Sequence, residues 1–528
     1  MTTTRSPWIL SPYWDISLFI ASPLLVIAVF TPLRLLTGSQ NLSLLLLAFF
    51  TFGHHLPGFL RSYGDRELFE RYRWRFLLAP PLVFGATFLF DFHGLHGLLL
   101  LVFLWDIWHV TMQNYGFLRL YDARLGLGEA NMAWLDRAVS ISWYVTFVLA
   151  SPHYLHDLLY RLFSSGVPIF PGAVPRAALF AGSAISVALS AWYVIHTIRR
   201  PRNWYKLATL GCFLFATWYL YVYLDDFVAG FAIWSAYHCL QYFGIVWAWN
   251  QKRPQMAPWA RVWFRPRVAW LFGYLALIFL YGAINYGAKA VEGAAASRYL
   301  LSFIIASGTL HYYYDAFIWK LRPPGRQPGW RSAGIAQAAV FASGLAVFAW
   351  LESAGAAPEA DIRQALVRLS PHAAISHLNW GEQLRAGGRW EEAAQEYAAA
   401  YERDASLTLA RERAGLLYSR IAVDALRGGD REKARRLFAR VAAASPLDAG
   451  ARVNLANVLM MDGRATEAER EFRLALGADP NHAMAHGNLG VLLVRSGRRA
   501  EAEEHLRFAL RHGDEAVRRV ARQIMGVH

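Results

Sequence analysis

The first two-thirds of the chain are a succession of long apolar segments separated by short polar loops. A stretch of about 20 mostly apolar residues is long enough to cross the hydrocarbon core of a bilayer as a helix. The pattern therefore predicts an all-α, polytopic transmembrane domain with eleven spans. The predicted spans are 15–36, 41–60, 76–91, 94–118, 138–157, 175–198, 204–224, 228–249, 268–287, 298–319 and 333–352.

Basic residues alternate between these loops. The loops after even-numbered spans carry clusters of Lys and Arg, as at Arg61, Arg66 and Arg71, whereas the other loops carry isolated ones such as Arg34. Lys and Arg are enriched in the cytoplasmic loops of membrane proteins. We therefore expect a protein of the bacterial inner membrane with a cytoplasmic N-terminus. Whatever follows the eleventh span is then periplasmic or otherwise extracytoplasmic.

The last third of the chain follows a different pattern, which repeats every 34 residues. Residues 448–480 align with 481–514, and a further unit, WGEQLRAGGRWEEAAQEYAAA, lies upstream with about seven extra residues between. The small and apolar residues that recur are Leu455 and Leu489, Gly429, Gly463 and Gly497, Ala434, Ala468 and Ala502, Phe438 and Phe472, and Pro446 and Pro480.

This 34-residue period resembles the tetratricopeptide repeat (TPR) over roughly 372–514, with Asp514 where the last repeat would often have Pro. The resemblance implies four helical hairpins stacked into a TPR-like α-solenoid, whose concave surface binds a protein or peptide partner. The alternative is that the repeats only pack on the membrane domain. We expect a transmembrane domain at 1–352, a linker at 353–371 and a repeat domain at 372–528.

Composition and charge change this picture little. The chain has 528 residues, of which 55% are hydrophobic, and a formal net charge of +15. Membrane-flanking loops hold most of the positive charge, so it does not indicate a nucleic-acid partner. The two cysteines, Cys212 and Cys239, both lie in apolar segments and indicate neither a disulfide framework nor a Cys-based zinc site.

Polar residues interrupt four of the predicted spans at a similar depth. Asp106, His109 and Gln113 in span four are spaced i, i+3, i+7, so they share one helix face. The others are His54 and His55 in span two, His238 and Gln241 in span eight, and His311 and Asp315 in span ten. The histidines precede the first basic residue by roughly 7 to 14 positions, which predicts one layer about 10–20 Å from the cytoplasmic boundary. Ionisable residues inside a membrane usually face the bundle interior and mark a functional site.

Histidine is the commonest metal ligand, and carboxylates complete many metal sites. We therefore expect a metal centre, with Gln113 and Gln241 orienting the ligand imidazoles through their other ring nitrogen. The expected ligands are His54 or His55, His109, His238 and His311, with Asp106 and Asp315 as ligands or catalytic bases. The alternative is that each histidine separately satisfies a buried backbone or tyrosine group.

An intramembrane histidine-rich site loosely resembles the general scheme of membrane non-heme iron oxygenases, although the boxes H-x-x-x-H and H-x-x-H-H are absent. The resemblance implies non-heme iron and an oxidoreductase, with oxidative or hydrolytic chemistry on a lipophilic small-molecule substrate. Zinc would also suit these ligands. A bis-histidine heme in a redox protein is a second hypothesis. A third is a transporter or assembly scaffold that uses the polar layer as a pathway.

Further polar residues follow the histidine layer on its cytoplasmic side. They are Arg119, Asp122, Asn250 and Lys320. These groups either bind the polar head of a substrate or a redox partner, or act as ordinary interfacial anchors.

Overall fold

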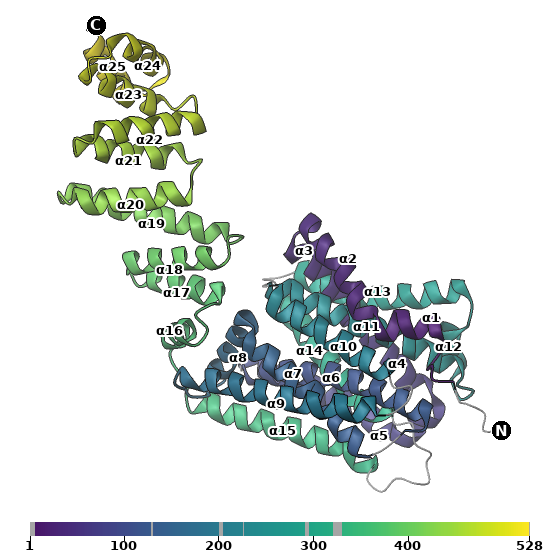
Figure 1. The fold of residues 1–528 in the computed structure, drawn as a ribbon. Helices are drawn as coiled ribbons and strands as arrows, with labels where there is room; N and C mark the ends of the chain where they lie inside the picture. Colours follow the sequence, from purple (N-terminus) through teal and green to yellow (C-terminus); the bar gives the residue numbers. More distant parts are fainter. Residues whose placement is uncertain are drawn as a thin grey trace. The chain divides into compact units, whose positions relative to one another are not determined.

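The computed structural model describes residues 6–94, 96–127, 130–199, 204–224, 226–290, 295–319 and 330–526. The chain divides into two compact units, Met1–Ser370 and Pro371–His528. Every secondary structure element of the described residues is a helix, which confirms the all-α prediction (Figure 1).

The first unit is built from long helices, several of which adjoin shorter π-helical or 3₁₀ segments. They are α1 (Pro12–Trp14), η1 (Asp15–Ile20), α2 (Ser22–Thr37), α3 (Ser39–Leu45), η2 (Leu46–Phe52), α4 (His55–Gly64), α5 (Arg66–Phe92), α6 (Gly97–Leu125), α7 (Ala130–Ala150), α8 (Pro152–Ser164), α9 (Ala173–Ile198), α10 (Trp204–Trp218), η3 (Tyr219–Tyr223), α11 (Phe227–Gln251), α12 (Pro258–Arg261), η4 (Val262–Phe264), α13 (Val268–Ala290), α14 (Ala295–Ile318), α15 (Trp330–Ser353) and α16 (Glu359–Leu369).

Each predicted span falls on one of these helices or on a run of adjoining ones, but the count of eleven crossings is not supported. Among the described residues, four helical stretches are long and apolar enough to cross a membrane, and a pair bent by 55° would add a fifth. The four are Ser39–Gly64, Ala173–Ile198, Val268–Gly287 and Ile335–Ser353, and the bent pair is Pro12–Ile20 with Ser22–Thr37. The helices at the other predicted spans carry more polar residues, such as a histidine and an aspartate in α14 and several charged residues in the first turns of α5.

Two boundaries differ from the sequence prediction. The span predicted at 138–157 is broken, because Ser151 accepts a hydrogen bond from the backbone N–H of Tyr154 at 3.3 Å and Pro152 begins α8. The loop predicted between spans two and three is largely helical, since α5 already begins at Arg66. There the Asp65 carboxylate accepts from the N–H of Leu68 at 3.2 Å and caps the helix.

The region predicted as a linker, 353–371, contains helix α16. Its apolar residues recur at i, i+3, i+4 and i+7, which is the spacing of an amphipathic helix. This face packs against α8 in one buried cluster, so the segment belongs to the first unit rather than to a free connection. The buried members are Leu155, Leu159, Phe163, Ile362, Ala365, Leu366 and Leu369.

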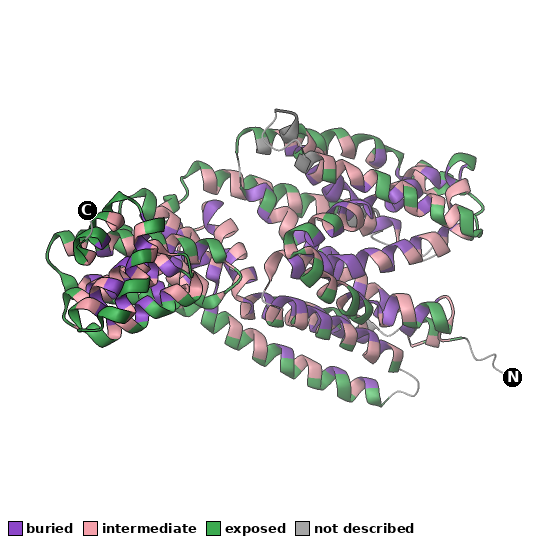
Figure 2. Cartoon of the chain, turned by 90° about the horizontal axis from the view of Figure 1, so that it is seen from above, coloured by how far each residue is buried: buried purple, intermediate pink, exposed green. Residues whose placement is uncertain are grey.

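Buried residues gather on the inward faces of the helices (Figure 2). In the first unit α11 packs against α2, α3 and η2. Its residues Ile233, Trp234 and Ala236 are fully buried. The polar side chains of α11 are therefore held in the interior of the unit.

The second unit consists of successive helical hairpins, as the 34-residue period predicts (Figure 1). The hairpins are α17 (Ala374–Ala386) with α18 (Trp390–Arg403), α19 (Thr408–Arg427) with α20 (Arg431–Ala444), α21 (Ala449–Met461) with α22 (Ala465–Ala478), and α23 (Ala483–Arg495) with α24 (Arg499–His512), followed by α25 (Glu515–Met525). In each hairpin the two helices pack on one another through small residues such as Ala434, Ala468 and Ala502, which are fully buried.

The irregular spacing after the first hairpin lies inside a helix and not in a loop. Helix α19 has 20 residues, whereas α17, α21 and α23 have 13 each. A glycine with positive φ ends the first helix of every hairpin, a conformation that glycine adopts without steric cost. These are Gly388, Gly429, Gly463 and Gly497, with φ of +74°, +85°, +75° and +81°.

Candidate metal centre

Four helices bring the five predicted histidines together. His54 and His55 stand at the start of α4, directly after the π-helical segment η2. His109 lies on α6, His238 on α11 and His311 on α14. All five are buried, with no more than 9% of any side chain exposed. π-Helical turns are rare and frequently occur beside functional sites.

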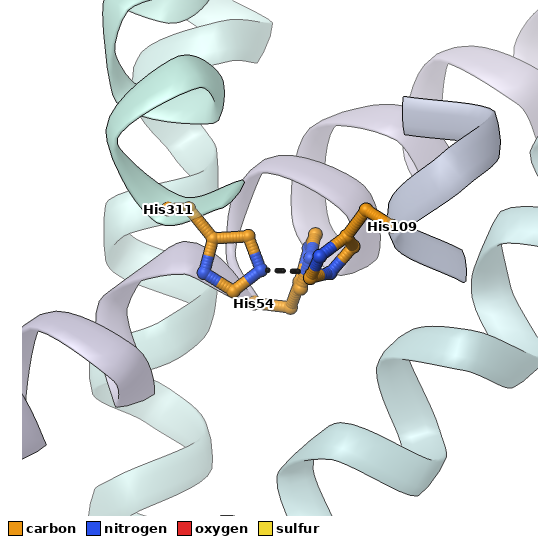
Figure 3. Close-up of side chains that lie close together, drawn as sticks. All are labelled: His54, His109 and His311. Carbon is orange, nitrogen blue, oxygen red and sulfur yellow. Dashed lines mark hydrogen bonds between the residues drawn. The ribbon is translucent and has the colours of Figure 1, made fainter. Parts of the chain in front are cut away.

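The imidazole nitrogens converge on one point (Figure 3). His109 Nε2 lies 3.2 Å from His311 Nε2, and His54 Nε2 lies 3.4 Å from His238 Nε2. One ring nitrogen from each of His54, His109 and His311 lies within 4.8 Å of the other two. Since these residues are more than 50 positions apart in sequence, only the packing of the helices creates the cluster.

The structure distinguishes the two adjacent histidines of α4. His54 packs its ring against His311, with centroids 4.5 Å apart, and its Nδ1 hydrogen-bonds the backbone carbonyl of Thr51. That bond requires a proton on Nδ1 and leaves the lone pair of Nε2 directed at the cluster. His55 also stacks on His311, with centroids 4.9 Å apart, and uses its Nδ1 for a 2.9 Å bond to the Ser307 hydroxyl.

The two predicted carboxylates flank the histidines, and each accepts a hydrogen bond from a tyrosine. Asp315 Oδ1 accepts from Tyr242 at 2.9 Å and from the Trp319 indole at 3.1 Å. Its Oδ2 lies 3.7 Å from His311 Nε2 and 4.0 Å from His109 Nε2. Asp106 Oδ1 accepts from Tyr312 at 2.7 Å, and its Oδ2 has no partner among the described residues.

The two glutamines do not contact the imidazole rings in the way the sequence interpretation expected. Gln113 donates to the backbone carbonyl of His238 and to the side-chain oxygen of Gln241, both at 3.0 Å. Gln241 in turn donates to the carbonyl of Phe19 at 3.0 Å. The glutamines therefore tie α6 to α11 and to the N-terminal segment, and they position the helix that carries His238 and not its ring.

Three residues around the site were missed by the sequence analysis, namely Tyr242, Tyr312 and Trp319. The first two follow a histidine at helical spacing or directly, which is a weak signal in a chain with 25 tyrosines. Gly58 was missed as well. A Cβ at this position would lie 2.7 Å from the Tyr242 hydroxyl and 3.3 Å from His311 Nδ1, so only glycine lets α4 approach the cluster this closely.

The polar residues predicted on the cytoplasmic side of the histidines lie in different environments. Asp122 accepts from Arg119 and from the buried Lys206, both at 2.6 Å, and Lys206 also lies 2.7 Å from Asp136. This network is internally balanced, as expected of an anchor. Asn250 lies beside the buried Arg61, whereas Lys320 lies outside the described residues.

Comparison with known proteins gives a match in the repeat unit. Residues 420–483 match the tetratricopeptide repeat family. No curated protein matches the chain. Similar solved structures include YrrB, described as a TPR protein with an unusual peptide-binding site (20% identity over 36% of this chain and 90% of that one, TM-score 0.24), and MamA (17%, 29% and 80%, 0.22). Another is MamA from Desulfovibrio magneticus RS-1 (20%, 31% and 84%, 0.21).

Proposed function

We propose that the helical unit is a membrane metalloprotein that carries out oxidative or hydrolytic chemistry on a lipophilic substrate, with non-heme iron as the metal. The observation that carries the proposal is the convergence of ring nitrogens from His54, His109 and His311, all within 4.8 Å of one another. Histidine nitrogens bind zinc, and by analogy iron, at about 2.0–2.1 Å, so two ligands of one tetrahedral ion lie about 3.3–3.4 Å apart. The 3.2 Å between the Nε2 atoms of His109 and His311 fits that spacing, and so does the 3.4 Å between the Nε2 atoms of His54 and His238.

The remaining ligand position has two candidates. His238 Nε2 adjoins His54, and Asp315 Oδ2 adjoins His311 and His109. A site with three protein ligands and one exchangeable position is typical of a catalytic centre, whereas four fixed ligands are typical of a structural one. If the position stays open, Asp315, held through its other oxygen by Tyr242 and Trp319, would lie beside it as a base.

A metal ion with histidine and carboxylate ligands would supply oxygen activation, or polarisation of a bound water, at this site. The chain supplies the rest. Burial excludes bulk water from the rings, and the Thr51 carbonyl fixes the tautomer of His54. Asp106 Oδ2 has no hydrogen-bond partner among the described residues, so it could serve as a base. These groups provide ligands, a base and an apolar surrounding, which suits a lipophilic substrate.

The packing disfavours heme. Two imidazoles that bind one heme lie on opposite faces of a wide, flat macrocycle, whereas the rings of His54 and His109 both pack directly on that of His311. The centroids of His109 and His311 are 4.8 Å apart, and those of His109 and His238 are 4.9 Å apart. A porphyrin would have to displace this whole cluster.

Membrane insertion is supported by the outward faces of the apolar helices. In α9 and α15 large apolar side chains point away from the unit, and the most apolar window of α15 has no buried residue. Phe180 is 79% exposed, Ile198 68% and Trp350 67%. Apolar surface of this extent is unfavourable in water and favourable in lipid. The proposed cytoplasmic N-terminus and extracytoplasmic repeat unit rest instead on the alternation of basic loops between the eleven predicted spans.

The repeat unit is assigned to partner binding. Tetratricopeptide repeats are interaction modules, and the group of potential metal ligands found among the described residues lies outside the hairpins of residues 371–526. We propose that a protein or peptide partner binds this unit outside the cytoplasm. A scaffold that only recruits a partner is the competing function, and the metal content of the protein separates the two.

Elemental analysis of the purified full-length protein, with a visible spectrum, tests the metal assignment. Stoichiometric iron without a Soret band is expected, and the metal should be lost in His109→Ala. The exposed His93 provides a matched control, because His93→Ala should retain the metal. Equal metal content in the two variants, or none in the wild type prepared with iron, would reject the metalloprotein and leave the scaffold.

Orientation is tested separately by fusing a reporter to the C-terminus. An enzyme that folds only after export should be active in this fusion, and one that works only in the cytoplasm should be silent. The reverse result would overturn the proposed location of the repeat unit without bearing on the metal.

A further inference from the structure

A buried arginine lies on the same face of α4 as the candidate ligand His54. Arg61 follows His54 by seven residues, about 10 Å along the helix axis. Only 1% of its side chain is exposed. Its guanidinium carbon lies 4.2 Å from the ring centroid of Trp319 and 5.8 Å from that of Trp249, so the two indoles flank the cation.

Nothing in the described part of the chain neutralises this charge by direct contact. Arg61 donates to the Asn250 side chain at 3.4 Å and to the Ile318 carbonyl at 3.1 Å, but its Nε has no acceptor. It forms no ion pair with any described carboxylate. A buried cation without a paired anion is costly, unless another group completes its environment.

Residues at the C-terminal end of α11 and just after it have the same surplus of donors. The side-chain N–H groups of Trp249, Asn250, Gln251 and Arg253 include buried nitrogens with no acceptor among the described residues. Arg253 adds a second guanidinium on Trp249, with its carbon 5.6 Å from the ring centroid. One carboxylate near them is Asp65, whose Oδ2 is 3.9 Å from Arg253 Nε.

Native proteins rarely leave buried donors unpaired, and a cluster of them calls for an acceptor from outside. A single oxyanion beside Arg61 and Arg253, whose guanidinium groups both lie against Trp249, would accept from their unpaired N–H groups and balance the excess positive charge. Guanidinium groups bind phosphate and carboxylate oxygens through paired N–H bonds.

We propose that Arg61, Asn250 and Arg253 form an oxyanion-binding site for the phosphate or carboxylate head of an amphiphilic ligand. This site deepens the proposed function, on which its link to a substrate rests, by naming the substrate class as a lipophilic anion. The link is Trp319, which stacks on Arg61 and donates its indole N–H to Asp315 at 3.1 Å. A head group bound at Arg61 would therefore place its apolar chain beside the histidine cluster.

Binding to the full-length protein in nonionic detergent tests the site directly. The probes are dihexanoyl phosphatidic acid, dihexanoyl phosphatidylcholine with the same chains, and inorganic phosphate. We expect saturable binding of the phosphatidic acid that weakens by about ten- to a hundredfold in Arg61→Met, the loss expected for hydrogen bonds to a charged group. Arg66→Met, which removes an exposed arginine five residues away, should bind as the wild type does.

Two further variants keep the test informative if Arg61→Met folds poorly. Arg253→Met changes a half-buried side chain and should give a smaller loss, and Arg61→Lys should retain part of the affinity because it keeps the charge. Binding of inorganic phosphate that depends on Arg61, without a gain from acyl chains, would support the oxyanion site with a free anion as its ligand. Equal binding of the two lipids, or unchanged affinity in Arg61→Met and Arg253→Met, would overturn the proposal.

His109→Ala separates this inference from the proposed function. If both hold, that variant loses its metal and still binds phosphatidic acid. Metal retained by His109→Ala, or absent from the wild type, together with Arg61-dependent anion binding would reject the metal proposal alone. Metal lost in His109→Ala, with no Arg61-dependent anion binding in any protein, would reject the anion site alone.

Discussion

His486 and His505 face one another across the last hairpin, with their Nδ1 atoms 2.7 Å apart. His486 Nε2 donates to the Pro480 carbonyl at 3.0 Å. Its Nδ1 must then be the acceptor while the ring is neutral, so the shared proton belongs to His505. If His486 also gained a proton on Nδ1, two N–H groups would point at each other.

Earlier hairpins have a carboxylate at this position. His377 bonds the Pro371 carbonyl at 3.0 Å and Glu396 at 2.6 Å. Arg452 bonds the Pro446 carbonyl and Glu471, both at 2.8 Å. The spacing along the chain is the same in all three hairpins, so the last one differs in chemistry and not in geometry.

From the contact between His486 and His505 we predict that acid destabilises the last hairpin. Burial, and then the charge of His486, lower the pKa of His505 below its ordinary value of 6.5. The unfolded chain therefore binds more protons than the folded one, and the stability present above pH 6.5 is lost as the pH falls below it. Amide hydrogen exchange in α23 and α24, corrected for intrinsic rates, should show less protection at pH 5.5 than at 7.5.

His505→Glu provides the matched variant, because it recreates the arrangement of His377 and Glu396. A carboxylate attracts the His486 imidazolium, so protection in α23 and α24 should hold or rise in acid. The same loss of protection in both proteins would show that the histidine pair is not its cause.

Close packing within the hairpins predicts a cost for the smallest substitution. A Cβ on Gly490 would lie 2.7 Å from Leu506 Cγ, whereas a Cβ on Gly477 would meet no atom within 4 Å. Gly490→Ala should destabilise the repeat unit by about 1–3 kcal/mol. Gly477→Ala should be neutral or stabilising by up to about 1 kcal/mol. Urea unfolding followed by helical circular dichroism measures the difference, and equal midpoints would contradict it.

Asp514, which departs from the repeat pattern, has a local function as a helix cap. Its carboxylate accepts from the N–H of Val517 at 2.8 Å, at the first turn of α25. Asp514→Ala should cost about 1 kcal/mol, while Asp514→Asn should cost little because Asn caps equally well. Hydrogen exchange confined to α25 reports the effect. Identical exchange in the two variants would mean that packing alone holds this helix.

The adjacent histidines of α4 should behave differently when each is replaced. His54→Ala removes a proposed ligand, so stoichiometric metal should be lost. His55→Ala removes a hydrogen bond to Ser307. It should retain the metal while costing about 1 kcal/mol of stability. Metal analysis and thermal unfolding of the same preparations decide the matter, and retention of metal by His54→Ala alone would reverse the assignment.

Part of this arrangement could be predicted from the sequence because it depends on spacing along one helix. Asp106 and His109 share a face of α6, and counting residues to the nearest basic loop placed the histidines of four helices at one level. The hairpins followed from a period of 34 residues. These features depend on periodicity, which a single sequence displays.

The remaining features depend on contacts between helices. Tyr312 reaches Asp106 from α14, and Tyr242 reaches Asp315 from α11. Each pair is separated by more than 70 residues, and no local pattern specifies it. Gln113 lies near the histidines, as predicted, but it bonds the backbone carbonyl of His238 and not an imidazole ring. The position of a residue along its helix does not determine which atom its side chain contacts. The count of eleven crossings is not supported, because interior polar residues lower the hydropathy of several predicted spans, and four described helices, or five with the bent pair, are long and apolar enough to cross a membrane.

The extra seven residues of α19 show how this array tolerates variation in length. Seven residues turn an α-helix by about 700°, only 20° short of two full revolutions, so residues on either side of the insertion keep their azimuth. An addition of five would rotate the downstream stripe by about 140° and direct its leucines into solvent. An insertion of seven residues therefore lengthens one helix of the array without rotating the residues that pack against the neighbouring hairpins.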